Sequence, residues 1–405
     1  MSDATFLKRV IVKNYKSIAE CDVRLQPLTF LVGQNGSGKS NFLDALRFVS
    51  DALRASLDHA LRERGGIGEV RRRSAGHPTH FGIRMEFGLK SGESGHYAFR
   101  VGALPNGGHT VQMEECVVSR PDEFPREHCF RIQDGEVMTT SGVGPAATTD
   151  RLYLVHASGI PEFRPVYDAF SRMGFYNLNP DRIRDLQLPD PGELLARDGS
   201  NLASVLDRVG RHDPEAKTRI EMRLASVVPG VRGVDVKVIG PRETIEFRQG
   251  MAGSEHPWRF SAINMSDGTL RALGVLVALF QVSNGTRARV PLVAIEEPEV
   301  ALHPAAAGVL LDSLRDASLK TQVLVTSHSP DLLDSKDVDP EWILAVVARE
   351  GITSVGSLNE VGRSAMRDHL YTAGELLRRD MLSADPSVWA QAAHAQLRLF
   401  DVGEN

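Results

Sequence analysis

The apolar positions in the first 60 residues predict two alternating strands, a third short strand and a helix. Residues 6–12 are rich in the apolar side chains typical of a strand, and residues 21–25 alternate apolar and polar side chains as a half-buried strand does. Residues 28–32 are almost continuously apolar, and from 40 to 53 the apolar side chains recur every three or four positions. The strand 28–32 is therefore expected to be buried and to lead directly into a helix with one buried face over 40–53.

Residues from about 65 to 160 are expected to be mostly β, because short strand patterns alternate there with Gly, Pro, Asn and Asp. The spacing becomes helical from 161 to about 228, and strand patterns return at 234–239 and 244–247. This stretch predicts an inserted lobe that mixes helices with strands. The strand candidates before it are 81–89, 97–104, 110–119, 129–133 and 152–155.

The last third of the chain alternates strand and helix patterns. An apolar helix is expected over 270–282, and apolar strands over 291–297 and 321–325. Such alternation favours a parallel sheet. We therefore predict an α/β fold with a mixed β-sheet N-terminal lobe, a central parallel sheet and an inserted helical lobe. The expected divisions are 1–160, 161–260, 261–345 and 346–405.

Composition indicates an ordinary globular protein of 405 residues, with 42% apolar and 24% charged side chains. Its three cysteines lack metal-ligand spacing and cannot all pair, which favours a reduced, cytoplasmic setting. The N-terminus has no apolar signal core, and the longest apolar run, 273–280, is too short to span a bilayer. No membrane association is expected.

The net charge of −5 argues against a wholly basic nucleic-acid-binding protein but permits local basic patches. Arg71, Arg72 and Arg73 are consecutive, with Arg62 and Arg64 nearby. A solvated loop is the favoured interpretation of this run. The alternative is a patch that contacts the phosphates of DNA or RNA.

A glycine-rich stretch, Gly33 to Ser40, connects the strand 28–32 to the helix 40–53. It fits the pattern G-x-x-x-x-G-K-[ST] without a mismatch, in the strand-to-helix context that this phosphate-binding pattern requires. Inward backbone N–H groups and the helix N-terminus would hold an anion. Lys39 would reach the β- and γ-phosphates and Ser40 would bind Mg²⁺. The candidate nucleotide-binding residues are Gly33, Gln34, Asn35, Gly36, Ser37, Gly38, Lys39, Ser40 and Asn41.

Two acids end the apolar strand 291–297. In phosphate-loop nucleotide hydrolases one such acid binds Mg²⁺ and another orients the attacking water. Glu296 is accordingly the candidate metal ligand, and Glu297 is the candidate catalytic residue that activates water. A solvated strand end is the alternative.

Two further motifs flank this acidic strand. Ser266-Asp267-Gly268 precedes the helix 270–282 and on its own predicts an N-cap, but a helix N-terminus with Ser and Gly also suits a γ-phosphate. Ser266 and Gly268 are therefore candidate binding residues. His328 follows the strand 321–325 and is placed to reach a γ-phosphate. The alternative is a structural loop histidine.

The order of these motifs resembles the ATP-binding-cassette (ABC) type ATPases of the RecF, SMC and Rad50 superfamily. Within it the sequence is most similar to the small AAA-21 type predicted ATPases, which include the ATPase parts of OLD-type nucleases and several anti-phage systems. The motifs that carry the resemblance are the phosphate loop, Ser266-Asp267-Gly268, Glu296-Glu297-Pro298-Glu299, Leu302-His303-Pro304 and Thr326-Ser327-His328-Ser329.

The resemblance implies ATP and Mg²⁺ as ligands and a head-to-tail homodimer that closes on two ATP molecules. Lys39 and Ser40 of one subunit would then face Ser266 and Gly268 of the other. Lys39, Glu297 and His328 would be the catalytic residues, with Glu297 activating the water and His328 sensing the γ-phosphate. The loop 301–303 would cross the dimer interface, and hydrolysis by a lone subunit would be slow.

Several features depart from the family pattern. Asp267 replaces a glycine of the transporter signature, and Glu296 replaces the usual aspartate. The glutamine that binds Mg²⁺ from the lobe junction is not readable, with Gln133 and Gln187 as candidates. Sustained heptads are absent between the two halves of the site, which disfavours long-arm tethering.

The segment after His328 lacks a second acidic core, so a nuclease is expected only as a separately encoded partner. We therefore predict an ATP-dependent dimerising switch that acts on DNA or RNA, or with such an effector, in DNA repair or antiviral defence. An ATP-binding assembly module, in which binding rather than hydrolysis is functional, is the alternative. A phosphotransferase shares only the phosphate loop.

Overall fold

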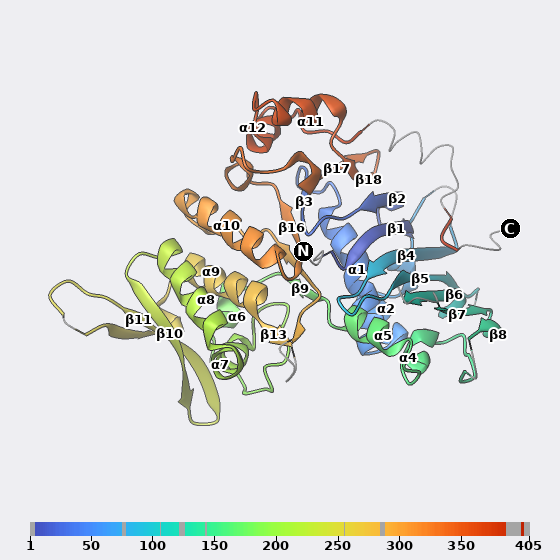
Figure 1. Ribbon diagram of the computed structural model, residues 1–405, viewed down its shortest axis with the longest axis horizontal. Coiled ribbons are helices and arrows are strands. Elements are labelled where there is room, and N and C mark those ends of the chain that lie inside the picture. The colour runs from blue at the N-terminus through green and yellow to red at the C-terminus, as the bar shows by residue number, and fades with distance from the viewer. Residues whose placement is uncertain are drawn as a thin grey trace. The chain divides into compact units, whose positions relative to one another are not determined.

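The computed structural model describes residues 5–74, 78–105, 107–120, 126–141, 144–254, 256–283, 288–385 and 398–400. The chain divides into two compact units (Figure 1). Unit 1 contains Met1–Met173, Asp339–Tyr371 and Arg379–Asn405, and unit 2 contains Gly174–Val338 and Thr372–Arg378.

Unit 1 is built on a mixed sheet whose strands are ordered β8-β7-β6-β5-β4-β1-β2-β18-β17-β3. Strand β3 pairs in parallel with β17, and β18 pairs in parallel with β2, whereas the run from β2 to β8 is antiparallel. The strands are β1 (Leu7–Tyr15), β2 (Ile18–Arg24), β3 (Leu28–Val32), β4 (His80–Gly88), β5 (Ser94–Ala103), β6 (His109–Arg120), β7 (Arg126–Gln133), β8 (Glu136–Thr140), β17 (Ile343–Arg349) and β18 (Ile352–Ser357).

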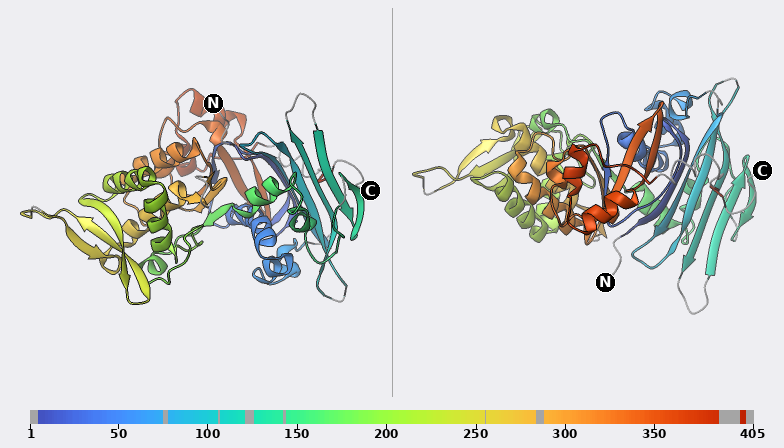
Figure 2. Two further views of the ribbon diagram at one scale, coloured as in Figure 1. Left: turned by 60° about the horizontal axis from the view of Figure 1, so that its bottom comes forward. Right: turned by 90° about the horizontal axis from the view of Figure 1, so that it is seen from above.

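Helices cover one face of this sheet (Figure 2). They pack on it through a cluster of aromatic rings. The ring of Phe48 on α1 lies 5.3 Å from that of Phe81, and Phe170 on α5 lies 5.6 Å from Phe87. The opposite face receives Leu399 and Phe400 near the end of the chain. The helices of unit 1 are α1 (Lys39–Arg54), α2 (Leu57–Arg62), α3 (Ile67–Val70), α4 (Tyr153–Ala157), α5 (Arg164–Ser171), η4 (Pro340–Trp342) and α11 (Glu360–Arg367).

The strand predicted over 152–155 is wrong, because these residues begin helix α4. The carboxylate of Glu114 on β6 accepts the backbone N–H groups of Tyr153 and Leu154, which are amides of the first helical turn. Such amides have no partner inside the helix. Burial raises the pKa of Glu114 to about 7, although the two amides and the Tyr97 hydroxyl act to lower it. A distant buried carboxylate thus supplies the cap that local sequence does not.

Helix α1 is fixed to its surroundings by Asp44. The Asp44 carboxylate accepts Arg64 Nε at 3.1 Å and the Tyr15 hydroxyl at 2.9 Å, and it pairs with Lys16 Nζ at 2.6 Å. Burial alone would raise the pKa of Asp44, but Arg64 and Lys16 together lower it to about 2. Asp44 therefore holds the helix that follows the glycine-rich loop against the β1–β2 turn.

Asp44→Asn is expected to lower the free energy of unfolding of unit 1 by about 2–4 kcal/mol, because it leaves the buried Arg64 guanidinium paired only with Asp51. The Asp44 contribution is complete above about pH 4 and is lost as the pH falls toward 2, since its pKa is depressed. Thermal unfolding of both proteins from pH 7 to pH 3 measures the difference, which should shrink in acid. Asp58→Asn, at the exposed Arg62 ion pair, is the control; equal effects of the two changes would contradict the prediction.

Unit 2 contains a parallel sheet of order β16-β15-β9 and an antiparallel sheet of order β10-β11-β12. The hairpin β10–β11 projects from a group of helices that includes α7, α8 and α9 (Figure 1). The strands are β9 (Gly174–Tyr176), β10 (Val231–Ile239), β11 (Arg242–Gln249), β12 (Trp258–Ser261), β13 (Val282–Ser283), β14 (Ala288–Arg289), β15 (Leu292–Glu296) and β16 (Gln322–Ser327).

Helix α9 is the core helix of unit 2, with its apolar residues from Leu270 to Phe280 buried. The helices of this unit are α6 (Pro180–Arg184), α7 (Leu202–His212), α8 (Pro214–Val227), η1 (Ala262–Asn264), α9 (Asp267–Phe280), η2 (Pro304–Ala306), α10 (Ala307–Ser318), η3 (Asp331–Leu333) and α12 (Ala373–Arg378).

The α/β fold predicted from the sequence is confirmed, with its mixed N-terminal sheet, parallel strands and helical lobe. The four-part division of the chain stays a prediction. Within the ranges that the structure describes, no helix combines the length and apolar character needed to cross a membrane.

Candidate functional site

The glycine-rich loop of unit 1 joins β3 to α1 in a conformation that only glycine permits at two points. Gly38 has φ +104°, and a Cβ atom there would lie 2.1 Å from Thr353 Oγ1. A Cβ atom at Gly33 would lie 2.1 Å from the carbonyl oxygen of Val346. Because real Cβ atoms never approach so closely, the loop is pressed against β17 and β18. Gly36, with φ +77°, completes the turn.

The Lys39 ammonium lies inside this loop. Its Nζ donates to the carbonyl oxygens of Gly33 at 2.8 Å and Gln34 at 3.0 Å. The lysine is thus held at the end of β3 by neutral acceptors, which a phosphate could replace with a stronger, charged partner. The Ser37 hydroxyl is buried and has no hydrogen-bond partner among the residues that the structure describes. A cradle with a cation and an orphaned hydroxyl suits an oxyanion.

The remaining predicted loop residues lie at the surface or on the first turn of α1. Gln34, Asn35 and Ser40 are exposed, and Asn41 Nδ2 donates to Ser17 Oγ at 2.6 Å. The residues from Gly33 to Asn41 thus all lie in the loop between β3 and α1 or in the first turn of α1, and their role in nucleotide binding stays a prediction.

Two contacts of the loop come from the C-terminal part of unit 1 and were missed by sequence reasoning. Thr353 Oγ1 donates to the carbonyl oxygen of Ser37 at 2.9 Å and shares a hydrogen bond of 2.7 Å with Ser17 Oγ. Asp380 accepts Gln34 Nε2 at 3.0 Å. Neither residue carries a local signal: Thr353 reaches the loop on strand β18, and Asp380 lies in the turn after α12.

In unit 2, the acids at the end of β15 meet the histidine that follows β16. Glu297 has φ +46°, a strained conformation for a residue with a side chain, and its N–H donates to the carbonyl oxygen of Thr326 at 3.0 Å. Glu297 Oε1 lies 3.0 Å from His328 Nδ1. Backbone strain of this kind is typical of functional sites. The structure therefore brings together two of the three predicted catalytic residues.

Glu299 is a third acid in this cluster. It belongs to the motif Glu296-Glu297-Pro298-Glu299, in which the sequence predicts roles for Glu296 and Glu297 only. Its Oε1 accepts the Ser327 hydroxyl at 2.6 Å, and its Oε2 is buried without a partner among the described side chains. Burial raises the pKa of Glu299, against the lowering effect of the Ser327 hydrogen bond. This contact ties the segment after β15 to the end of β16, beneath Glu297 and His328.

Ser266 caps helix α9 and is exposed. Its Oγ accepts the N–H of Thr269 at 3.2 Å, so the N-cap interpretation is correct, and it shares a second hydrogen bond of 2.9 Å with the Thr269 hydroxyl. A Cβ atom at Gly268 would lie 2.4 Å from the carbonyl oxygen of Ala301, which itself has φ +65°. The signature turn is therefore packed tightly on the exposed loop 301–303. Asp267 pairs with Arg184 on α6.

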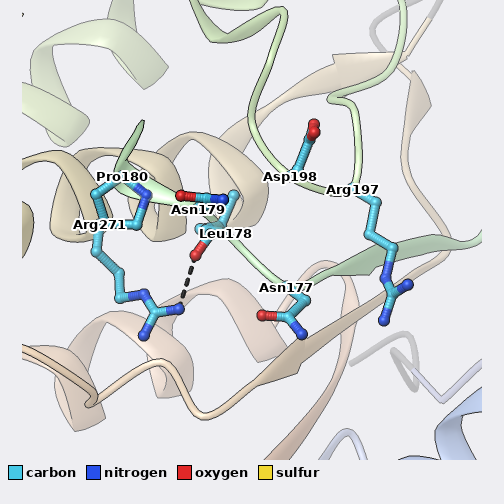
Figure 3. Close-up of a pocket in the computed structure, with 7 residues that line it drawn as sticks. All are labelled: Asn177, Leu178, Asn179, Pro180, Arg197, Asp198 and Arg271. Atoms are coloured by element: carbon cyan, nitrogen blue, oxygen red, sulfur yellow. Dashed lines mark hydrogen bonds between the residues drawn. The ribbon is translucent and has the colours of Figure 1, made fainter. Parts of the chain in front are cut away.

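An open pocket of about 360 Å³ lies at the carboxyl end of β9 (Figure 3). Because Ile295 pairs with Tyr176 in the parallel register, Asn177 follows β9 beside Glu296. Arg197 Nη2 forms an ion pair of 2.9 Å with Glu296 Oε1. The pocket is lined by Asn177, Leu178, Asn179, Pro180, Arg197, Asp198 and Arg271.

Neither glutamine suggested as an Mg²⁺ ligand is suited to that role. Gln187 is buried, its Nε2 donates to the carbonyl oxygens of Ile183 and Gly199, and its Oε1 accepts the N–H of Ala203. Gln133 ends β7 beside the hairpin to β8. Asn177, next to Glu296, is the amide side chain better placed for this function.

The candidate metal ligands fit Mg²⁺ in chemistry. Ser40 offers a hydroxyl and Glu296 a carboxylate, and hard oxygen donors are what Mg²⁺ prefers. Across the described residues, no group of three or more His, Cys, Asp or Glu could hold a metal ion by itself. That is expected of Mg²⁺, which commonly binds through one or two protein ligands together with substrate phosphates and water.

The arginine run 71–73 is better explained by internal contacts than by a nucleic-acid site. Arg71 Nη1 donates to the carbonyl oxygen of Pro78, and Arg73 pairs with Glu69. Nearby, Arg64 is buried against Asp44. Arg62 and Arg73 are exposed, as a solvated loop predicts, whereas Arg64 is buried. The alternative, a patch that contacts phosphates, stays a prediction.

Comparison with known proteins agrees with the site. Residues 145–334 match the family model described as "AAA domain, putative AbiEii toxin, Type IV TA system", and residues 6–87 match the AAA ATPase domain. The chain is 23% identical to an OLD nuclease of Thermus scotoductus, over 85% of this chain and 65% of that protein. It is 49% identical to the DNA replication and repair protein RecF of Porphyromonas gingivalis, over 11% of this chain and 12% of that protein.

A third relative is the structural maintenance of chromosomes protein 1 of Schizosaccharomyces pombe, at 26% identity over 40% of this chain and 14% of that protein. The chain thus spans less than two thirds of the length of each of these relatives.

Among solved structures, an SMC head bound to the C-winged helix domain of ScpA has a TM-score of 0.57 at 16% identity, covering 88% of this chain and 99% of that one. The Smc head domain of Pyrococcus furiosus with an extended coiled coil, bound to the C-terminal domain of ScpA, has a TM-score of 0.53 at 14% identity, covering 90% and 99%. The fold is therefore that of an SMC-type head. Together, the family matches, the relatives and this fold support an ABC-type ATPase of the RecF, SMC and Rad50 type.

Proposed function

We propose that this protein binds ATP with Mg²⁺ and hydrolyses it slowly as a switch that dimerises on ATP. The observation that carries the proposal is the glycine-rich loop, whose lysine is held by two carbonyl oxygens at the N-terminus of a helix. Backbone N–H groups, a helix dipole and a lysine together recognise the phosphates of a nucleotide. The family matches support the same ligand.

The residues present would divide the work as follows. Ser40 and Glu296 are the proposed Mg²⁺ ligands, with Asn177 beside Glu296, and the ion would neutralise phosphate charge when bound. Glu297 would accept a proton from the attacking water, and His328, hydrogen-bonded to it, would orient its carboxylate. Lys39 would balance charge that develops on the phosphates.

Dimerisation is supported by exposed groups that have no catalytic use within one subunit. Ser266 lies exposed at the N-terminus of a 14-residue helix, where an anion is stabilised, and Ala301 and His303 are exposed beside it. A second subunit would bring its own nucleotide to this surface. The partner that senses the closed dimer would be a nucleic acid or a separately encoded effector.

Calorimetry of the purified full-length protein tests the proposal. ATP is expected to bind in the presence of Mg²⁺, and light scattering should detect dimers on addition of ATP. Phosphate release should be slow, on the order of one turnover per second or less, which is low among enzymes. Protein that binds no ATP under these conditions would refute nucleotide binding, and phosphorylation of a second substrate would favour a phosphotransferase.

Thr353→Val is expected to weaken ATP binding about fivefold, because the Ser37 carbonyl and the Ser17 hydroxyl lose their common partner and the loop loses its support. Thr353→Ser retains the hydroxyl and is the matched control. Titration with ATP in a calorimeter gives both dissociation constants. Equal weakening by the two variants would contradict the prediction, because Thr353→Ser keeps the hydroxyl that makes both hydrogen bonds.

A further inference from the structure

The ion pair between Arg197 and Glu296 is unexpected in a site that should bind a cation. Glu296 is the acid best placed to bind Mg²⁺, and Arg197 Nη2 lies 2.9 Å from its Oε1. An arginine and a metal ion compete for the same carboxylate, because both stabilise its negative charge. The structure therefore shows this carboxylate in contact with a protein cation.

The backbone around Arg197 is held firmly, whereas its side chain is accessible. The Arg197 carbonyl oxygen accepts the N–H of Asn177 at 2.9 Å, and the neighbouring Ala196 N–H donates to Asn201 Oδ1 at 2.7 Å. The Arg197 side chain is 48% exposed, and that of Glu296 is 19% exposed. A fixed backbone with a half-exposed side chain lets the guanidinium leave Glu296 without unfolding the segment.

The open pocket gives the released side chain a place to go. Arg197 lines it together with Asn177 and Asn179, while Asp198 points away from the end of the Arg197 side chain (Figure 3). Arg271, on the far side, already donates to the carbonyl oxygen of Leu178 at 2.7 Å and is not available to replace Arg197 at Glu296 in this arrangement.

We propose that Arg197 guards the metal site: it holds Glu296 until Mg²⁺ arrives together with the phosphates of a nucleotide. Free Mg²⁺ that displaces the guanidinium would gain only the Glu296 carboxylate as a ligand at this position. The Mg²⁺–nucleotide complex brings phosphate oxygens as further ligands and so competes better with Arg197. Arg197 would thus make metal binding depend on nucleotide. This role rests on the proposed binding of Mg²⁺ and ATP. It adds Arg197 as the residue that makes metal binding depend on nucleotide.

The test is the Mg²⁺ dependence of ATP binding by the full-length protein, measured by calorimetry. Arg197→Ala is expected to lower the Mg²⁺ concentration for half-maximal binding about fivefold, which is the upper range for an exposed ion pair. Arg197→Lys should lie between it and the natural protein. Arg182→Ala is the matched control, since Arg182 is exposed and its ion pair, of 3.9 Å, is with Asp198.

A double-mutant cycle shows whether Arg197 acts through Glu296. In a Glu296→Gln background, Arg197→Ala should leave the Mg²⁺ dependence unchanged. Binding of Mn²⁺ without nucleotide, followed by electron paramagnetic resonance, should be stronger in Arg197→Ala than in the natural protein, and Arg197→Gln provides a second variant if the alanine protein does not fold.

The possible outcomes distinguish a failure of the proposed Arg197 role, here called the guard, from a failure of the proposed function. If the natural protein binds Mg²⁺ and ATP but Arg197→Ala needs the same or more Mg²⁺, the guard is wrong and the proposed function stands. A shift that persists in the Glu296→Gln background would mean that Arg197 acts on the phosphates, which also overturns the guard. A natural protein that binds no ATP at any Mg²⁺ concentration would overturn both.

Discussion

Lys39→Ala is expected to weaken ATP binding by about 10- to 100-fold and to reduce phosphate release below detection. The Lys39 ammonium is the cation held within the phosphate loop, 2.8 Å from the Gly33 carbonyl oxygen. Hydrogen bonds to charged groups contribute about 1.5–3 kcal/mol, which corresponds to the expected loss of affinity. The loss of turnover should be larger, because charge on the phosphates grows as the reaction proceeds.

Two further variants serve as controls for Lys39→Ala. Lys13→Ala removes another lysine of unit 1, one that pairs with Glu20 across β1 and β2, and should leave ATP binding unchanged. Lys39→Arg keeps the charge but replaces a compact ammonium with a planar fork, so it should restore affinity only in part. Isothermal titration with ATP measures all three, and circular dichroism confirms that they fold. ATP affinity that survives in Lys39→Ala would exclude the loop as the nucleotide site.

The phosphate loop could be predicted from the sequence because its conformation depends on nearby residues. Glycine at positions 36 and 38 permits the positive φ angles, and the helix that follows supplies the N-terminus. Its support could not be predicted. Thr353 reaches the loop because β18 pairs in parallel with β2, where Thr353 lies opposite Ile18. No local pattern specifies that long-range register.

Short apolar runs were the least certain part of the fold. Residues 152–155 read equally as a strand or as a helix start by periodicity alone. The buried carboxylate of Glu114 decides the matter by accepting the first amides of α4. Longer segments with a sustained period, such as the helix from Asp267 to Phe280, were predicted with their ends within a few residues.

Pairs of residues in space were likewise hidden from the sequence. The proximity of Glu297 and His328 follows from the parallel pairing of β15 with β16, which places both strand ends at one edge of the sheet. The shared edge of the two strands could be inferred from the sequence. The Arg197–Glu296 ion pair could not be inferred, because Arg197 lies in an irregular segment whose position no periodicity predicts.

Glu297→Gln is expected to keep ATP binding and to reduce phosphate release by about 10²–10³-fold. The amide has the size of the carboxylate and can keep a hydrogen bond to His328 Nδ1, but it cannot accept a proton from water. ATP that is bound but not hydrolysed should keep the subunits together. Light scattering with ATP should therefore find a persistent dimer, whereas the natural protein returns to its starting state as ATP is consumed.

Glu215→Gln is the matched control, because Glu215 is an exposed acid in the first turn of α8; it should release phosphate at the natural rate. Unchanged turnover in Glu297→Gln would exclude Glu297 as the base and direct attention to Glu299, the buried acid beside it. In cells, Lys39→Ala and Glu297→Gln together distinguish a switch that requires hydrolysis from an assembly module that requires only ATP binding. If Lys39→Ala abolishes biological function while Glu297→Gln retains it, ATP binding and assembly are the working step; if both abolish it, the cycle of hydrolysis is required.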